Sequence, residues 1–418
     1  MGGELGPQGE AGDPAIGAVT ESAAHPEVRA PGGGGVSVPT IAREWTRIGC
    51  IGFGGPPTHI ALLRRLCVTD RGWISATEFE DGIAATNLLP GPASTQLAIF
   101  CAWRLRGIVG ALVGGLCFIV PGLVVILGLS ALFLASHPPR EVQGAAAGAG
   151  AAVAAVALNA AIGLMPASWR RIGSSRAEKA RWLAYGAAGA AAAATIGSFL
   201  VLILLAAGVA EVSVRQLWPQ PAARLHSFAS IPVLAVAAAA GGLGALVWEA
   251  FKVGALSYGG GFVIIPLMQT DVVHVYHWMT GGQFLNAVAL GQITPGPVVQ
   301  TVAVVGYAAA GLGGGLLAAL VAFSPSFAFV LLGARHFERL RSNLGIQAFL
   351  TGAGPAAIGA IAGAAIPLGL ALTQVWQAGV LGAALIWMLV LRRNVVIGLV
   401  VAALIGVLAS VLGVPVGT

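Results

Sequence analysis

Leu89-Pro90-Gly91-Pro92 and Thr294-Pro295-Gly296-Pro297 each interrupt an apolar segment that is long enough to enter a membrane. A shift of 205 residues superimposes the two Pro-Gly-Pro runs, and without a gap it gives 14 identical pairs over the 55 positions 44–98. Trp73 then pairs with Trp278. Gly and Ala match often by chance in this composition, but a matched Trp and a matched Pro-Gly-Pro do not. The sequence therefore indicates an internal duplication.

The composition is that of a membrane protein. Of the 418 residues, 57% are hydrophobic and 9% charged, with a mean hydropathy of +0.87, whereas soluble domains carry about 25% charged residues. Several uncharged segments exceed the roughly 20 residues that cross about 30 Å of hydrocarbon. Their continuous rather than alternating apolarity favours helices over a barrel. We therefore predict an all-α integral protein that crosses the lipid bilayer of the plasma membrane several times.

The chain divides into four predicted parts. Residues 1–40 are rich in Gly, Pro, Ala and Glu without an apolar run, which is typical of a disordered tail. This tail lacks the apolar core of a signal peptide, and we expect it to be cytoplasmic. The first repeat covers 41–209 and the second 249–418. The linker between them, 210–248, contains one extra apolar segment at 231–248, which we interpret as a membrane helix.

Each repeat begins with two apolar segments that are broken near their middles. The breaks lie at 52–57 and 89–92 in the first repeat, and at 258–261 and 294–297 in the second. A Pro pair flanking Gly removes helix hydrogen bonds and forces the preceding residue out of the helical conformation, so each segment should form two half-helices. Such backbone is too costly to expose to lipid. It must line a cavity or pack inside the protein.

The distribution of basic residues predicts that the repeats are inverted. Five arginines flank the broken segments of the first repeat, and uncharged residues occupy the aligned positions of the second: Arg64, Arg65, Arg71, Arg104 and Arg106. Unbroken spans follow at about 108–135, 144–166 and 182–209, with counterparts at 312–333, 346–370, 375–391 and 395–413. Basic clusters follow the second of these spans in the first repeat (170–181) but the first in the second repeat (335–341). Because basic loops stay cytoplasmic, this offset by one crossing indicates two inverted repeats with re-entrant or broken helices, and the linker helix supplies the odd crossing.

The half-helix that begins at Pro92 has the features of an anion site. Proline costs nothing at a first helical position, and the free N–H groups that follow come with the side chains of Ser94, Thr95 and Gln96. The second repeat offers Gln300 and Thr301. Helix N-termini carry about half a positive charge each and bind anions through backbone donors. Two such ends meeting near the midplane would suit a small oxyanion; the alternative is that Pro-Gly-Pro only kinks packed helices.

Charged residues at membrane depth are functional candidates. Arg47 and Lys252 are aligned, and each lies three residues after a glutamate, so each can face that glutamate on one helix surface. A structural ion pair and a role as anion ligand both remain open. His59 has no counterpart in the second repeat. It is either a packing histidine or a proton carrier near neutral pH.

Other function classes find little support. The glycine runs lack a Walker lysine and a flanking βαβ pattern, so close approach of a ligand or of a crossing helix explains them better than a nucleotide loop does. The four cysteines have no Cys-x-x-Cys spacing, which argues against a disulfide framework, a metal site or a cofactor. Nucleic-acid binding needs a soluble basic face. We find no spacing of nucleophile and base that would support an enzyme.

Taken together, these motifs resemble the chromate ion transporter family, whose long-chain members have two homologous halves. The resemblance covers residues 40–415 and rests on Gly52-Phe53-Gly54-Gly55-Pro56, on Ser257-Tyr258-Gly259-Gly260-Gly261 and on the two Pro-Gly-Pro runs. Gly52 and Asn87 depart from the Ser and Gln that are common in the first half, whereas Ser257 and Gln292 keep the usual types in the second.

The resemblance implies export of chromate, a tetrahedral dianion, driven by the proton gradient or the membrane potential. The residues alone predict only a small anion, and sulfate has almost the same shape and charge. A membrane enzyme or scaffold is the alternative from another class, and a homodimer is left open. The predicted substrate-binding residues are Gly54, Gly55, His59, Pro90, Gly91, Pro92, Ser94, Thr95, Gln96, Gly259, Gly260, Pro295, Gly296, Pro297, Gln300, Thr301, Arg47 and Lys252.

Overall fold

The computed structural model describes residues 2–3, 35–87, 89–135, 137–195, 200–217, 242–257, 262–333 and 342–416. Within these ranges the protein consists of helices and connecting turns, without a β-strand. Four helical stretches are long and apolar enough to cross a membrane: Ala93–Phe133, Arg140–Trp169, Val298–Gly333 and Leu344–Leu370. The predicted all-α membrane fold is confirmed. Most of the predicted tail, most of the linker and the cluster 335–341 lie outside the described residues.

The breaks of the first repeat occur where the turn formers predict them. Its first helix ends at Ile51 and the next begins at Pro56; a second gap separates Thr86 from Ala93. The helices are α1 (Val38–Ile51), α2 (Pro56–Arg64) with a π-helical continuation η1 (Arg65–Asp70), α3 (Ala76–Thr86), α4 (Ala93–Phe133), α5 (Arg140–Ala151), α6 (Val153–Trp169), α7 (Arg176–Thr195) and α8 (Leu200–Val214).

The second repeat follows the same plan. Its helices are α10 (Gly242–Leu256), α11 (Ile264–Thr270) continued by η3 (Asp271–Val275), α12 (Gly281–Ile293), the short η4 (Val298–Gln300), α13 (Thr301–Gly333), α15 (Leu344–Leu370), α16 (Val375–Leu385) continued by η6 (Ile386–Val390), and α17 (Val395–Val411). Residues 242–248, predicted to belong to the linker helix, continue directly into Glu249 within α10. No proline interrupts α10, so nothing in its sequence ends the helix there.

A second pair of matching kinks follows the matching turns. Within α4, Arg106 has φ −147° and ψ 26° and Gly107 has φ 58° and ψ −145°. Within α13, Ala310 has φ −152° and ψ 32° and Gly311 has φ 62° and ψ −156°. These kinks lie 204 residues apart (310 − 106), one fewer than the 205 that separate the Pro-Gly-Pro turns. The second repeat therefore has one residue fewer than the first between its Pro-Gly-Pro turn and this kink.

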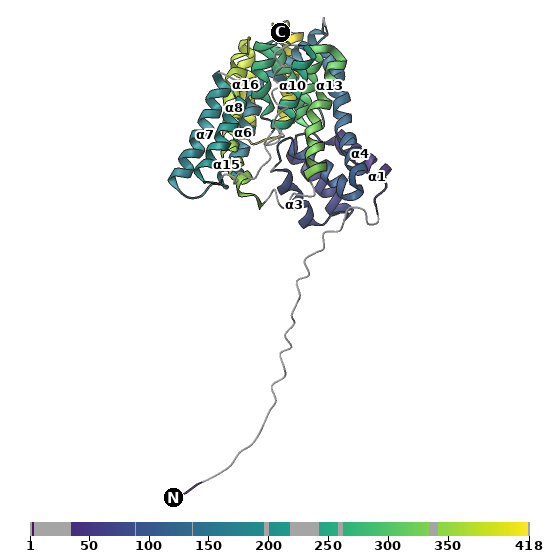
Figure 1. Ribbon diagram of the computed structural model, residues 1–418. Helices are drawn as coiled ribbons and strands as arrows, with labels where there is room; N and C mark the ends of the chain where they lie inside the picture. Colours follow the sequence, from purple (N-terminus) through teal and green to yellow (C-terminus); the bar gives the residue numbers. More distant parts are fainter. Residues whose placement is uncertain are drawn as a thin grey trace.

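The two repeats are inverted, as predicted. In Figure 1, α1 and α3 lie at the lower end of the molecule, whereas α10, the counterpart of α1, lies at the upper end. The repeats also share the signal that starts the third helix of each. Ser75 accepts a hydrogen bond from the N–H of Glu78, and Thr280 accepts one from Gln283, both at 3.2 Å. These caps satisfy N–H groups that have no intrahelical partner.

The repeats are interlocked by packing between their later helices. α15 of the second repeat packs against α7 and α8 of the first, and α5 of the first packs against α17 of the second. Glycines make these crossings close, because a β-carbon at Gly359 would collide with the carbonyl oxygen of Gly186, and one at Gly148 with that of Ala402. Small residues at crossings are how helices associate within lipid. Large apolar side chains such as Leu320 and Leu404 remain exposed on the outside of the protein, as lipid-facing positions would be.

Candidate functional site

The Pro-Gly-Pro turn of the first repeat lies against helices of the second repeat. Gly91 has φ +116°, a conformation that favours glycine. A β-carbon there would lie 3.3 Å from the carbonyl oxygen of Gly254 in α10 and 3.5 Å from the Ser326 hydroxyl in α13, and it would also crowd the Gln96 amide, 2.5 Å away. The turn is therefore held where a bulkier residue does not fit.

The first turn of α4 carries buried hydrogen-bonding groups. The N–H groups of Thr95 and Gln96 donate to Pro92 O at 2.9 and 3.0 Å. Those of Ala93 and Ser94, at the very start of the helix, have no intrahelical acceptor. The Gln96 amide donates to Pro90 O at 2.6 Å. Ser94, Thr95 and Gln96 are at most 2% exposed.

Hydroxyl groups around this turn lack partners. Among the described residues, Thr95 Oγ1 and Ser326 Oγ are buried without a hydrogen-bond partner. Thr95 lies in the first turn of α4, and Ser326 lies beside Gly91. An unsatisfied buried polar group costs about 1–3 kcal/mol, and a water molecule, an ion or a ligand can satisfy it. A hydroxyl can donate a hydrogen bond to an anion.

The corresponding turn of the second repeat is chemically different. The Gly296 N–H donates to Gly52 O at 3.0 Å, the Gln300 amide donates to Ile119 O at 2.8 Å, and the Thr301 hydroxyl donates to Val298 O at 2.9 Å. Val298 and Val299 begin this helix in place of hydroxyl residues. Three of its donors are thus already used inside the protein.

The contacts of the two turns do not show the predicted meeting of two helix ends. The described contacts of Gly91 are with Gly254 and Ser326, and those of the Pro295–Pro297 turn are with Gly52 and Gly122. Each turn therefore packs against helices of the opposite repeat. Hydrogen bonding indicates that the one-residue difference lies between Pro297 and Gln300, which makes Gln300, rather than Thr301, the counterpart of Gln96. Both amides donate to backbone carbonyls and leave a buried oxygen unpaired.

His59 joins three parts of the site. Its Nε2 lies 2.9 Å from Gly52 O and its Nδ1 lies 3.2 Å from the Ser94 hydroxyl. Because a carbonyl oxygen only accepts, Nε2 carries the proton of this bond, and the Ser94 hydroxyl donates to Nδ1 in the neutral ring. The ring is fully buried and packs edge-on against Phe118, with centroids 5.0 Å apart. Gly52 O also accepts from Gly296, so His59 links the break of α1 to both turns.

The two aligned basic residues lie in ion pairs. Arg47 is 70% exposed, and its guanidinium lies 3.7 Å from the Glu44 carboxylate, which Arg71 also contacts at 3.2 Å. The structure does not bring Arg47 to either turn. The Arg47 side chain faces outward from α1, whereas its partner Glu44 is buried.

Lys252 is instead buried among acids. Its ammonium lies 2.7 Å from Glu249 and also pairs with Asp271, and the Lys252 side chain is 6% exposed. Burial, with the charges of Glu249 and Asp271 nearby, raises the pKa of Tyr276, which follows η3. Both acids pair with the ammonium, so Lys252 is already compensated without a bound anion.

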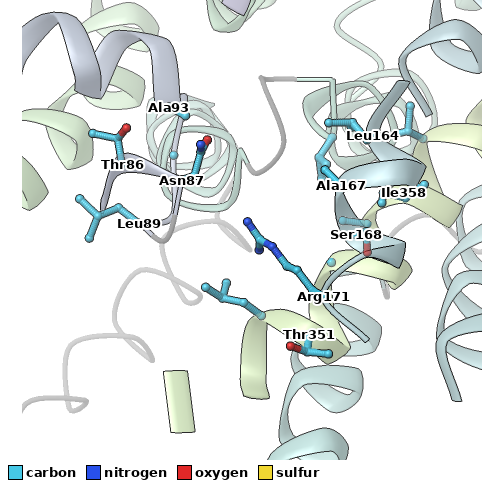
Figure 2. Close-up of a pocket in the computed structure, with 16 residues that line it drawn as sticks. Thr86, Asn87, Leu89, Ala93, Leu164, Ala167, Ser168, Arg171, Thr351 and Ile358 are labelled. Carbon is cyan, nitrogen blue, oxygen red and sulfur yellow. The ribbon is translucent and has the colours of Figure 1, made fainter. Parts of the chain in front are cut away.

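A cavity of about 140 Å³ opens beside the turn of the first repeat. Its lining comes from the end of α3 and the following turn, the C-terminal end of α6, and α15: Thr86, Asn87, Leu89, Gly91, Ala93, Leu164, Ala167, Ser168, Arg171, Val263, Leu350, Thr351, Gly354, Ala357, Ile358 and Ile361. In Figure 2, Arg171 extends from the end of α6 across this space toward the turn that carries Asn87 and Leu89. The start of α4 therefore borders a cavity that is also lined by Arg171.

Further glycines predicted to bind substrate belong to the predicted break in the first apolar segment of each repeat. Gly54 and Gly55 have φ +97° and +75° at the break before α2, and a β-carbon at Gly55 would lie 3.7 Å from Val298. Gly259 and Gly260 lie outside the described residues. Of the cysteines, Cys67 and Cys101 are buried, but Cys50 is exposed.

Sequence reasoning missed Arg171 and Ser326 as site residues. Arg171 belongs to a basic cluster whose composition indicates only a cytoplasmic loop, and Ser326 lies within apolar helical sequence. No local signal places them beside residues 90–92, which lie far from them in the chain. Only the packing of α6 and α13 brings them there.

Comparisons with known proteins agree with this architecture. The family described as "Chromate transporter" matches residues 39–212 and 244–407. The "Chromate transport protein" of Cupriavidus metallidurans is 33% identical over 78% of this chain and 82% of its own length. The protein of that name from Pseudomonas aeruginosa is 30% identical over 80% and 81%, and the "Probable chromate transport protein" of Synechococcus elongatus is 30% identical over 80% and 85%. No solved structure matches the chain.

Proposed function

Because the chain belongs to the chromate transporter family, we propose that it exports chromate from the cytoplasm across the plasma membrane. Inverted repeats with interrupted helices are the architecture of secondary transporters, which bind substrate where such helices break. The proton gradient or the membrane potential then drives export. The match to the family over both repeats is the observation that carries this proposal.

The proposed binding site lies at the start of α4. The free N–H groups of Ala93 and Ser94 and the unpartnered hydroxyl of Thr95 offer donors to an oxyanion. The partial positive charge of the helix N-terminus favours the bound anion. Pro90, Gly91 and Pro92 shape the approach, and Gln96 fixes the turn through Pro90 O. Gln300 and Thr301 stabilise the opposite turn, and His59 connects the two.

Transport into inside-out vesicles tests the function. Vesicles that contain the protein should accumulate radiolabelled chromate faster than vesicles without it, because export from the cell becomes uptake in this orientation. Intact cells that express the chain should accumulate less chromate than controls. Sulfate added as a competitor measures selectivity between two anions of similar shape. Equal chromate accumulation with and without membrane-inserted protein would rule out chromate export and favour another anion.

Substitution at the turn tests the site. Gly91→Val adds a β-branched side chain at φ +116°, where it would also crowd Gln96 and Gly254. We expect transport to fall to background while the protein still reaches the membrane. Gly163→Val is the matched control, because a β-carbon at Gly163 meets nothing within 4 Å. Normal transport by the Gly91 variant would show that the turn has only a structural role.

A further inference from the structure

We propose that the cavity beside Gly91 is the binding site through which an oxyanion dianion reaches the start of α4, and that Arg171 is its cationic ligand. This inference rests on the proposed function and deepens it. The cavity is bounded by the turn of the first repeat, α6 and α15. Figure 2 shows the guanidinium directed across it.

Charge explains why this site needs a side-chain cation. A helix N-terminus supplies about half a unit of positive charge, whereas chromate and sulfate carry two negative charges. The second turn adds little, because the Gly296 N–H is used by Gly52 and apolar Val298 and Val299 begin its helix. A dianion bound at α4 alone would remain largely uncompensated, which is unfavourable away from water.

Arg171 meets this need by its position. The two basic residues that the sequence singles out, Arg47 and Lys252, do not line the cavity. Arg171 lines the same cavity as Gly91 and Ala93. A planar guanidinium can form two parallel hydrogen bonds with a tetrahedral oxyanion, which a lysine cannot reproduce.

The other walls of the cavity fit this ligand. Asn87 and Thr351 add neutral polar side chains, and the described lining contains no carboxylate that would repel an anion. Buried hydroxyls without partners, Thr95 and Ser326, lie just behind the turn. Their hydroxyls are donors that remain available beside the turn. The apolar remainder of the lining comes mainly from α6 and α15.

Transport kinetics provide the first test. Arg171→Gln should raise the KM for chromate in inside-out vesicles at least about tenfold, because hydrogen bonds to charged groups are worth about 1.5–3 kcal/mol and about 1.4 kcal/mol is a factor of ten. Arg171→Lys keeps the charge but loses the paired N–H donors of the guanidinium, so its KM should be intermediate. Arg170→Gln is the matched control, since Arg170 does not line the cavity. An unchanged KM for Arg171→Gln, with rates normalised to folded protein, would overturn the proposal.

Protection from thiol labelling provides a readout that does not require transport or an arginine substitution. Thr351→Cys, in a variant whose four native cysteines are replaced by serine, should react with a sulfonated methanethiosulfonate reagent. Chromate and sulfate should each slow this reaction, whereas chloride at equal ionic strength should not. Protection by sulfate without chromate transport would leave the site standing and reject chromate as substrate. Chromate transport without protection by either dianion would reject the site and leave the function standing.

Discussion

At the residue scale, aligned positions in the two repeats have acquired different surroundings. Glu44 and Glu249 are both buried on the first helix of their repeat. Glu44 is neutralised by two arginines whose side chains are more than half exposed, Arg47 and Arg71. Glu249 shares buried Lys252 with Asp271. The aligned glutamates therefore differ in their partners: Glu44 pairs with exposed arginines, and Glu249 pairs with a buried lysine.

This difference predicts unequal effects on stability. Lys252→Gln should leave two carboxylates without their cation, and removing one partner of a buried ion pair costs about 3–5 kcal/mol. Arg47→Gln should change stability by less than about 1 kcal/mol, because exposed ion pairs contribute little. The amount of folded protein and the melting temperature in detergent measure both effects.

A variant that removes all three charges serves as the control for this ion cluster. Combining Lys252→Met with Glu249→Gln and Asp271→Asn should recover most of the loss, since no charge then remains buried without a partner. If Lys252→Gln instead leaves the amount of folded protein unchanged and raises the KM for chromate, Lys252 is an anion ligand rather than a structural residue.

At the element scale, the fold depends on helices of opposite repeats that cross closely. α5 contacts α17 through Gly144, Gly148 and Gly406, where backbone approaches backbone. The equivalent crossing in the other half places α15 on α7 and α8. Lipid is as apolar as the side chains, so close van der Waals packing rather than the hydrophobic effect holds these helices together.

The α5–α17 crossing should therefore be sensitive to a small increase in volume. Gly148→Val places its side chain into the backbone of Ala402 and Gly406, and overpacking of this kind costs about 1–3 kcal/mol. We expect a lower melting temperature and less folded protein in the membrane. Gly382→Val, on α16, should be close to neutral, because a β-carbon there meets nothing within 4 Å. Equal stability of both variants would contradict close packing at this crossing.

The sequence predicted the helix breaks but not the partners of the broken ends. Pro56, Gly91 and Pro92 determine local backbone geometry, which a residue type signals directly. The packing of Gly91 against Ser326 depends on how α4, α10 and α13 assemble. Many of the small residues in this chain could form such a crossing, so the partner cannot be identified from residue type. For the same reason Arg171 was recognisable as a basic loop residue but not as part of a cavity.

At the scale of the whole molecule, the inverted repeats give the transporter two similar halves with different chemistry. The first repeat carries the hydroxyl-bearing turn and most of the basic residues that flank the broken helices, and the cavity lies between this turn, α6 and α15 of the second repeat. The second repeat braces this region through α10 and α13. Because the repeats have unlike turns, the substrate is expected to interact more strongly with the first. Whether two such molecules form a homodimer stays a prediction.

The orientation of the two repeats in the membrane can be measured at aligned positions. Thr69 and His274 correspond under the shift of 205 residues, and both are exposed. In a variant whose four cysteines are replaced by serine, Thr69→Cys should react with a membrane-impermeant thiol reagent only from the cytoplasmic side, because basic loops flank it. His274→Cys should react only from the outside, since the second repeat is inverted. Labelling of both positions from one side would be incompatible with inverted repeats in the membrane. Labelling from opposite sides, but with Thr69→Cys outside, would keep the inversion and reverse the assignment of the cytoplasmic face.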